Sequence, residues 1–523
     1  MAQNVSLGTV RRALISTHDK AGLIDLARGL AKLGIEIIAS GGTATSLEAA
    51  DVPLTRVESY TGAKEILGGR VKTLHPKIHA GILADRRDPS HMRELEREGY
   101  QPIDLVVCSL YPFAQKLKEG AGRPTLIETI DIGGPSLLRA AAKNAEGGVT
   151  VVCDGADYAP VLESLTRDGS VSDEIRRALA AKAFAHTAKY DATVSDWMAA
   201  GLGERTGSSL LPERIEGFTR VMDLRYGENP QQRGALYREQ GTASGVANGT
   251  LLSGKALSYN NLLDMDAAYR AVSLWHSPTC AIVKHTNPCG LAEAATQEAA
   301  FAAALAGDPV AAYGSVIAFN TQLTATTAQA IRASKLFVEC IAAPGFDEKA
   351  LGELKARENL RLFVMPPGDP APRYHAHRIG GGFLVEQTDA HQWDPGAWTC
   401  VTTQTVPAPW RAELAFAMQA AAVLKSNAIA ITKDRQLLGA GAGQMSRVDA
   451  VEQAIKKAGS RVAGSFLGSD AFFPFADSVR LAAQAGVVAV VQPGGSKRDD
   501  EVIAACNELR IAMLFTGMRH FRH

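Results

Sequence analysis

The first 200 residues alternate short apolar runs, rich in β-branched residues, with longer stretches of helical character. The runs fall at residues 13–16, 36–40, 105–108 and 149–153, and the first two helical stretches at residues 21–33 and 44–50. This alternation predicts a parallel sheet covered by helices. The two later runs are almost wholly apolar, which is typical of central strands buried on both faces.

The length of 523 residues predicts about three domains or two large ones, at roughly 100 to 200 residues each. Residues 201–209 are rich in turn formers and have no periodicity, so we expect a boundary near residue 200, with domains of residues 1–200 and 201–523.

The second domain contains a faint internal echo. An apolar run at residues 281–283 precedes a Gly-bearing turn and an Ala-rich helix near 296–306, and a similar series runs from 428–431 to a helix near 447–457. The echo is equally consistent with a duplication and with coincidence. The Pro-rich residues 366–372 mark either the seam between two lobes or a surface loop.

Charge and cysteine usage exclude several classes of protein. The 55 Lys and Arg residues balance 55 Asp and Glu residues, which argues against a nucleic-acid or membrane-surface protein. No apolar run reaches the ~18 residues of a membrane span, and the first residues lack a signal-peptide core, so a cytoplasmic location is expected. The seven cysteines are scattered and never paired as CxxC, which predicts reduced, mostly buried thiols and no zinc ribbon.

Two Gly-containing loops in the first domain predict anion binding. Residues 40–43 follow a strand and open a helix, so their backbone N–H groups are suited to a phosphate, although a tight turn is the simpler interpretation. Residues 68–79 hold three cations and two imidazoles, with no acid between Glu65 and Asp85. A phosphorylated small molecule is the expected partner of this basic segment.

The loop at residues 131–136 leads into a helix on which Arg139 and Lys143 are four residues apart and share a face. This spacing fits either a shared anion or an exposed basic stripe. If Lys143 lies in a cleft, burial and Arg139 would lower its pKa toward acid–base use.

In the second domain, Lys284 and His285 follow an apolar run, at the end of a predicted buried strand where α/β sites usually lie. This pairing of an ammonium with an imidazole predicts catalysis. Pro288 and Cys289 begin like the PCxxC of zinc deaminases, but Ala292 stands at the second Cys position and no HxE precedes it, so a zinc-activated water is disfavoured. The last residues, 518–523, have the composition of a frayed tail.

Long motifs across nearly the whole chain resemble the bifunctional AICAR formyltransferase/IMP cyclohydrolase family. They are STHDK, ASGGTA, GGRVKTLHPKIHAGILA, SLYPF, DIGGPSLLRAAAKN, RYGENPQQ, KHTNPCG, LKSNAIAI, GAGQMSR and SDAFFPF. The resemblance implies an α/β fold, with a methylglyoxal-synthase-like parallel-sheet domain followed by a larger formyltransferase region of two cytidine-deaminase-like lobes without zinc.

The resemblance also implies two consecutive reactions. A formyl group passes from the co-substrate 10-formyltetrahydrofolate to AICAR, and formyl-AICAR then closes to IMP with loss of water. It implies small-molecule substrates, no nucleic acid, no membrane, no catalytic metal and a homodimer. The residues alone also allow a methylglyoxal-synthase-type phosphosugar enzyme or a non-catalytic nucleotide-binding regulator.

Site residues follow from the resemblance position by position. The implied catalytic residues are Lys143 for cyclisation and Lys284, His285 and Asn427 for formyl transfer. The implied cyclohydrolase contacts are His18, Asp19, Lys20, Ser40, Gly41, Gly42, Thr43, Arg70, Val71, Lys72, Thr73, Cys108, Ser109, Tyr111, Asp131 and Ile132. The implied substrate and folate contacts of the formyltransferase are Arg225, Tyr226, Gly314, Glu339, Arg447, Phe472, Ser496, Lys497 and Arg519. His18 stands where the family often has Ser.

Overall fold

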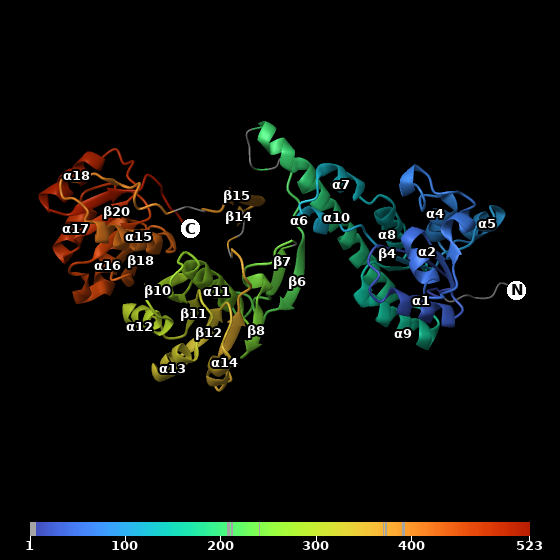
Figure 1. The fold of residues 1–523 in the computed structure, drawn as a ribbon, viewed down its shortest axis with the longest axis horizontal. Coiled ribbons are helices and arrows are strands. Elements are labelled where there is room, and N and C mark those ends of the chain that lie inside the picture. The colour runs from blue at the N-terminus through green and yellow to red at the C-terminus, as the bar shows by residue number, and fades with distance from the viewer. Residues whose placement is uncertain are drawn as a thin grey trace. The chain divides into compact units, whose positions relative to one another are not determined.

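The computed structural model describes residues 7–206, 210, 213–239, 241–369, 371, 374–389 and 393–523. The chain divides into two compact units, Met1–Gly217 and Phe218–His523, here called unit 1 and unit 2 (Figure 1). Helix α10 (Asp173–Thr206) continues through residues 201–206, where we expected a loop. The break between the units therefore falls after this turn-rich segment, and residues 207–209 lie outside the described residues.

Unit 1 contains a five-stranded sheet in the order β3-β2-β1-β4-β5, in which every pairing is parallel. The strands are β1 (Arg12–Thr17), β2 (Glu36–Ala39), β3 (Thr55–Arg56), β4 (Leu105–Ser109) and β5 (Thr150–Val152). The four apolar runs of the first domain are β1, β2, β4 and β5, so the predicted parallel sheet is confirmed. Leu14, Ile38, Val106 and Val151 are fully buried in its core.

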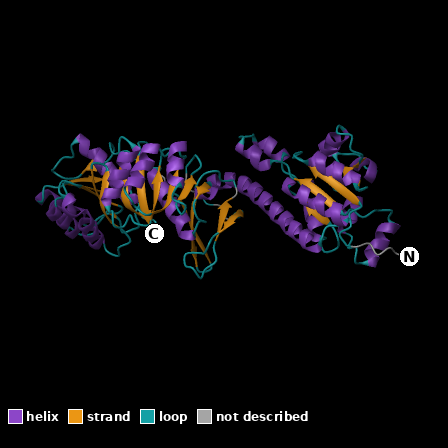
Figure 2. Ribbon diagram, turned by 90° about the horizontal axis from the view of Figure 1, so that it is seen from below, coloured by secondary structure: helices purple, strands orange, loops and turns teal. Residues whose placement is uncertain are grey.

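Helices surround this sheet (Figure 2). Besides α10 they are α1 (Leu23–Lys32), α2 (Gly41–Glu48), α3 (Val57–Thr61), α4 (Pro76–Leu83), α5 (Pro89–Arg97), α6 (Phe113–Lys118), α7 (Arg123–Glu128), α8 (Gly133–Lys143) and α9 (Tyr158–Asp168), with short 3-10 turns at Leu67–Gly69 and Gly155–Asp157. Helices α1 and α2 are those predicted at residues 21–33 and 44–50.

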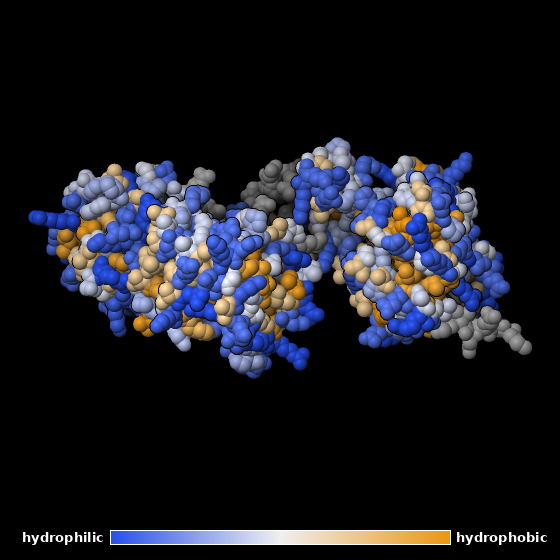
Figure 3. Space-filling model, turned by 60° about the horizontal axis from the view of Figure 1, so that its bottom comes forward, coloured by the Kyte–Doolittle hydropathy of each residue, from blue (hydrophilic) through white to orange (hydrophobic). Residues whose placement is uncertain are grey.

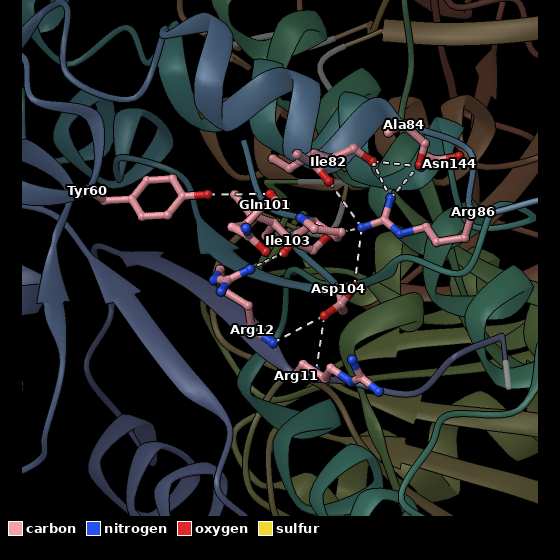
Figure 4. Close-up of polar contacts among 12 residues, drawn as sticks. Arg11, Arg12, Tyr60, Ile82, Ala84, Arg86, Gln101, Ile103, Asp104 and Asn144 are labelled. Carbon is pink, nitrogen blue, oxygen red and sulfur yellow. Dashed lines mark hydrogen bonds and ion pairs between the residues drawn. The ribbon is translucent and has the colours of Figure 1, made fainter. Parts of the chain in front are cut away.

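A polar cluster locks the edge of the unit 1 sheet where β1 and β4 begin (Figure 4). Asp104 accepts the backbone N–H groups of Arg11 at 3.0 Å and Arg12 at 3.1 Å. Arg86 donates to Asp104 and to four backbone carbonyls of the neighbouring segments. The Asn144 amide donates to the carbonyls of residues 82 and 84, two of the same four. This cluster ties β1, β4, α4 and α8 together.

Unit 2 is built on a twelve-stranded sheet in the order β16-β21-β20-β19-β17-β18-β10-β9-β11-β12-β13-β8. Lobe A contains β9 (Thr279–Lys284), β10 (Asn287–Glu293), β11 (Ser315–Phe319), β12 (Val338–Ala343) and β13 (Arg361–Val364). Lobe B contains β17 (Ile429–Lys433), β18 (Gln436–Gly441), β19 (Phe466–Ser469), β20 (Ala489–Gln492) and β21 (Ala512–Phe515).

The two lobes have the same strand pattern. In each, the first two strands form an antiparallel hairpin, the third strand pairs antiparallel with the first, and the fourth and fifth continue parallel to the third. Strands β10 and β18 join the lobes at Ala292 and Gln436. The internal echo is therefore a real structural duplication. Its two predicted helices are α12 (Gln297–Gly307) and α16 (Arg447–Ala458).

The remaining elements of unit 2 include two separate two-stranded sheets, β6 with β7 and β14 with β15. They are β6 (Phe218–Asp223), β7 (Ala235–Glu239), β8 (Thr250–Ser253), α11 (Tyr259–Val272), α13 (Ala325–Ala333), α14 (Glu348–Lys355), β14 (Tyr374–Ile379), β15 (Gly382–Gln387), β16 (Thr399–Cys400), α15 (Ala408–Ala422), α17 (Asp477–Ala485) and α18 (Asp499–Glu508), with 3-10 turns at Val246–Asn248 and Gly459–Val462. The Pro-rich residues 366–372 follow β13, the last strand of lobe A, as expected of a seam; Pro370 and Pro372 lie outside the described residues.

All seven cysteines are free, and five of them are buried, as predicted. Among the helices in the described ranges, none combines the length and apolar character needed to cross a bilayer. The surface in Figure 3 is mostly hydrophilic, with smaller apolar groups between.

Candidate functional sites

The first candidate site lies where β1 and β2 of unit 1 end. The Thr43 hydroxyl, in the first turn of α2, donates to the Thr17 carbonyl at 2.9 Å and accepts the Thr17 N–H at 3.1 Å. Lys20 donates to the same hydroxyl at 2.9 Å. These bonds fix the Ser40–Thr43 loop against the end of β1. Gly41 has φ 48, and a Cβ there would lie 3.0 Å from the Lys72 ammonium nitrogen.

Strand β4 contributes the next side of this site. The Ser109 hydroxyl, at the end of β4, accepts the backbone N–H groups of His18 at 2.8 Å and Asp19 at 3.1 Å. The His18 ring meets the Tyr111 ring edge to face, with centroids 5.9 Å apart. Cys108 is buried, and burial raises the pKa of its thiol, so it serves packing rather than nucleophilic chemistry.

Asp131 closes the site from the loop before α8. Its carboxylate accepts the N–H groups of Gly134 at 2.8 Å and Tyr111 at 3.3 Å, while its own N–H donates to the Tyr190 hydroxyl at 2.7 Å. Burial raises the pKa of Asp131, and nearby Lys72 acts in the opposite direction. Asp131 is thus a half-buried carboxyl suited to proton transfer.

Lys72 is the cation around which this site is arranged. It faces Gly41, and its charge acts on the pKa of both Lys20 and Asp131. The pKa of Lys20 is lowered, first by burial and then by Lys72. Two ammonium groups brought together in this way favour an anionic ligand between them.

Several other predicted residues of unit 1 have their own contacts within the chain. Arg70 pairs with Glu128 of α7, and both side chains are exposed. Lys77 lies over the Tyr60 ring, with its nitrogen 4.7 Å from the centroid. Two of the three cations in the basic segment at residues 68–79 therefore have partners within the chain, and anion binding by this segment stays a prediction. Val71 forms an isolated β-bridge with residue 66, and the side chain of Thr73 lies close to Gly133. Ile132 is exposed, and a Cβ added to Gly42 would contact no other atom.

Lys143 is the last residue of α8, roughly 15 Å along the helix axis from Gly133 at 1.5 Å per residue. It is exposed, and it forms no ion pair within the part of the chain that the structure describes. Arg139 on the same helix lies over the Phe184 ring at 5.5 Å. The structure thus leaves the Lys143 ammonium open to a ligand but does not place it beside Lys72.

The second candidate site lies in unit 2, at the turn between β9 and β10. Lys284 ends β9 and donates to the Tyr313 carbonyl at 2.9 Å. His285 and Thr286 form the turn, with φ 54 and 62. Asn287 donates to the His285 carbonyl at 3.0 Å and accepts the Lys425 N–H at 2.9 Å. The turn therefore contacts the segment that leads into β17.

Asn427 stands in that segment, within a buried polar network. Its amide nitrogen donates to the Gln444 carbonyl at 2.9 Å, and its amide oxygen accepts from Arg447 at 2.7 Å. Arg447 also pairs with Asp470, and both side chains are almost fully buried. Arg447 therefore supports Asn427 from inside the lobe, and its contact with substrate or folate stays a prediction.

The C-terminal residues pack beside this network and are not frayed, contrary to the simplest interpretation of their sequence. His520 is buried and donates its N–H to the Asp470 carbonyl at 2.9 Å. Arg522 donates its N–H to the Ser426 hydroxyl at 3.0 Å, and burial lowers the pKa of its guanidinium to about 10. The Lys425 side chain donates to the carbonyl of His523 at 2.5 Å.

Most of the other predicted formyltransferase residues lie at or next to strand ends, on the edge of the twelve-stranded sheet where β9 ends at Lys284. Gly314 precedes β11 and Glu339 lies in β12, where its carboxylate pairs with Arg361 at 2.7 Å. Phe472 follows β19, Ser496 and Lys497 follow β20, and Arg519 follows β21, with its guanidinium over the Phe521 ring. Arg225 donates to the Tyr226 hydroxyl at 2.9 Å.

Sequence reasoning missed three residues of this region: Asp264 on α11, Asp470 after β19 and Arg522 in the tail. Asp264 accepts the Thr286 N–H at 2.7 Å. Asp470 stands within the SDAFFPF motif, so the motif was a usable signal for it. Nothing in the local sequence distinguishes Asp264 from an ordinary helix-surface acid. In the described ranges, no group of three or more His, Cys, Asp and Glu residues is placed to hold a metal ion.

Two family models match the chain. Residues 22–136 match the model of the MGS-like domain, and residues 141–457 match that of the AICARFT/IMPCHase bienzyme. The chain is 47% identical over 521 residues to the bifunctional purine biosynthesis protein PurH of Rhodopirellula baltica, covering 98% of this chain and 99% of the relative. It is also 47% identical over 520 residues to PurH of Desulfitobacterium hafniense, covering 98% and 100%.

Among solved structures, a chain of the crystal structure of ForH has 37% sequence identity and covers 36% of this chain and 97% of its own, with a TM-score of 0.33. That score is too low to bear on the fold.

The parallel-sheet unit, the two-lobed unit and their separate polar sites define a bifunctional α/β enzyme. The coverage and the sequence identity of the matches then show which family of bifunctional enzymes it is. The chain belongs to the AICARFT/IMPCHase bienzyme family.

Proposed function

We propose that this chain carries out the last two steps of IMP synthesis, with formyl transfer in unit 2 and cyclisation in unit 1. AICAR and 10-formyltetrahydrofolate give formyl-AICAR and tetrahydrofolate, and formyl-AICAR then gives IMP and water. Family membership supports both activities. The observation that best supports the assignment of chemistry within the chain is the Lys284–Asn287 turn, which meets the Asn427 network at one sheet edge.

Formyl transfer needs a base and a cation, and the turn carries both. The amino group of AICAR is a poor nucleophile because its lone pair is conjugated with the imidazole and the carboxamide. Its nitrogen bonds to the formyl carbon while His285 takes the amine proton, since the unprotonated nitrogen of a neutral imidazole is a proton acceptor. Lys284 stabilises the oxyanion that forms, and the folate nitrogen leaves with the bonding electron pair and takes up a proton. Asn427 supplies a neutral hydrogen bond to the same region.

Cyclisation is intramolecular, so holding the formyl carbon against the carboxamide nitrogen lowers much of its barrier. Lys20, Lys72 and the Ser40–Thr43 loop are suited to anchor the phosphate. Tyr111, Asp131 and Lys143 are proposed for oxyanion stabilisation and proton transfer. The open position of Lys143, at the far end of α8, suits contact with the reacting end of a nucleotide whose phosphate is held near Lys72.

The protein is further proposed to be a cytoplasmic homodimer. Seven free cysteines are typical of a reducing compartment. Ile379, Phe383 and Leu384 are exposed on the β14–β15 hairpin, and such apolar surface is usually covered by a partner. Light scattering behind a sizing column measures the mass directly, and a monomer at micromolar concentration would contradict the dimer.

One assay separates this function from the two alternatives. The protein is mixed with AICAR and 10-formyltetrahydrofolate, and tetrahydrofolate and IMP are followed together. We expect both products. A methylglyoxal-synthase-type enzyme or a non-catalytic nucleotide-binding regulator would give neither, and each would leave Lys284 and His285 without a role.

A further inference from the structure

The turn that carries the predicted catalytic pair has a structural copy in the other lobe. The β9–β10 turn spans residues 284–287 and the β17–β18 turn spans residues 433–436, each with two residues between the paired strand ends. The turn residues are His285 (φ 54) and Thr286 (φ 62) in lobe A, and Asp434 (φ 52) and Arg435 (φ 54) in lobe B. A two-residue hairpin with both φ values positive is type I′, which favours Asn and Gly.

None of the four turn residues is Asn or Gly, and in each turn a side chain from a neighbouring helix holds the backbone. A side chain at positive φ is disfavoured, and a β-branched one such as Thr286 most of all. In both lobes the partner is a half-buried carboxylate from the helix packed beside the hairpin. Asp264 on α11 accepts the Thr286 N–H at 2.7 Å and also hydrogen-bonds the His285 backbone. Glu413 on α15 accepts the Arg435 N–H at 3.1 Å.

The two lobes share this backbone arrangement but not its chemistry. The lysine before each turn donates to the carbonyl of a residue that precedes the third strand, Lys284 to Tyr313 at 2.9 Å and Lys433 to Ala463 at 3.1 Å. Lobe A then presents the imidazole of His285. Lobe B presents a carboxylate, and its Arg435 is paired with Glu293 at 2.8 Å. The lobe B turn lacks the imidazole, so loss of its Glu413 carboxylate measures only what such a carboxylate contributes to folding.

We propose that Asp264 is a positioning residue for formyl transfer. Its carboxylate fixes the left-handed backbone of His285 and Thr286, and so sets the direction in which the imidazole and the Lys284 ammonium point. This inference rests on the proposed role of His285. Asp264 acts through the turn, so it needs no contact with substrate. The titratable groups that face it are Lys284 and His285 from the turn and Cys340 from β12.

The test compares Asp264→Ala and Asp264→Asn with the matched variants Glu413→Ala and Glu413→Gln. Asp264→Ala lowers kcat for formyl transfer about 100-fold, the cost of a misplacement near 1 Å, with KM for AICAR within about 3-fold. Asp264→Asn keeps one acceptor oxygen, so we expect an intermediate loss of about 10-fold. The Glu413 variants lose the equivalent contact yet keep formyl transfer within about 2-fold. Cyclisation of supplied formyl-AICAR stays unchanged in all four, because it takes place in unit 1. Chemical denaturation followed by a probe in unit 2 reports that the altered unit is folded.

The split between kcat and KM separates positioning from general packing. Loss of positioning lowers kcat while KM for AICAR stays within about 3-fold, and the conservative Asp264→Asn recovers part of the loss. Equal losses in the Asp264 and Glu413 series, or a loss that appears in KM and not in kcat, would overturn the proposal, as would full formyl transfer by Asp264→Ala when His285→Ala is inactive. Full activity of His285→Ala would instead reject the catalytic role of His285, and with it any need to position that residue.

Discussion

Arg447 and Asp470 form an ion pair inside lobe B, with side chains only 5% and 0% exposed. Lobe A has uncharged groups in the equivalent places. Asn320 accepts the Thr279 N–H at 2.9 Å, as Asp470 accepts the Ala428 N–H at 3.1 Å. Because the pair supports Asn427 from inside, it ties the stability of unit 2 to the geometry of the formyl-transfer site.

Breaking that pair is expected to be costly. Asp470→Asn leaves the Arg447 charge buried without its partner, so the free energy of unfolding of unit 2 falls by about 3–5 kcal/mol. Chemical denaturation followed by a probe in unit 2 measures this. Glu508→Gln, which breaks the exposed pair with Arg480, is the control and changes little. An equally small effect of Asp470→Asn would contradict the prediction.

Removal of the Arg86 guanidinium is expected to lower the stability of unit 1 without lowering its cyclisation activity. Arg86→Met leaves the Asp104 carboxylate without its cationic partner and removes one donor from each of four carbonyls, which lowers the free energy of unfolding of unit 1 by about 3–5 kcal/mol. The cluster lies where β1 and β4 begin and the candidate site lies where they end, so kcat for cyclisation at low temperature stays near wild type. Arg87→Met, which removes an exposed pair with Asp85, is the matched control. A fall in kcat without a fall in stability would show that the two ends are coupled.

The lowered pKa of Lys20 leads to a prediction of how ligand affinity changes with pH. Burial, aided by Lys72, lowers the pKa of Lys20, so its ammonium loses its proton below the ordinary value of about 10.4. If that ammonium holds phosphate, affinity for IMP weakens as the pH rises through this lowered pKa. Calorimetric titration between pH 7 and roughly 10 follows the change, and Lys20→Arg moves it to higher pH because a guanidinium keeps its proton. Constant affinity across this range would remove Lys20 from the phosphate anchor.

Lys143→Ala tests the cyclisation chemistry. A general acid or base contributes about 10²- to 10⁴-fold, so kcat for cyclisation falls by that factor while the Kd for IMP changes little. Lys116→Ala, which removes an exposed lysine paired with Glu119, is the control. Normal turnover by Lys143→Ala would assign the proton transfer to other residues, with Asp131 the first to test.

Local patterns in the sequence were enough to predict the elements that position both sites. The apolar runs predicted β1, β2, β4 and β5, because a strand buried on both faces has apolar residues at consecutive positions. The echo between residues 281–306 and 428–457 was confirmed as two lobes, because the same strand, turn and helix are repeated.

Local sequence patterns could not predict contacts between residues that lie far apart in the chain. Arg70 appeared to have no acid nearby, yet its partner Glu128 comes from α7. Asp264 lies on an ordinary helix, and only the fold brings it to Thr286. The C-terminal tail has a polar composition, but Arg522 finds partners at Val423 and Ser426, far away in the chain.

The central claim is that two activities occupy separate sites on one chain, with His285 in only one of them. The most direct test measures both activities of His285→Ala: tetrahydrofolate release from AICAR and 10-formyltetrahydrofolate, and IMP formation from supplied formyl-AICAR. We expect formyl transfer to be abolished and cyclisation to remain at the wild-type rate. Equal loss of both activities in a folded protein would contradict the separation of the sites.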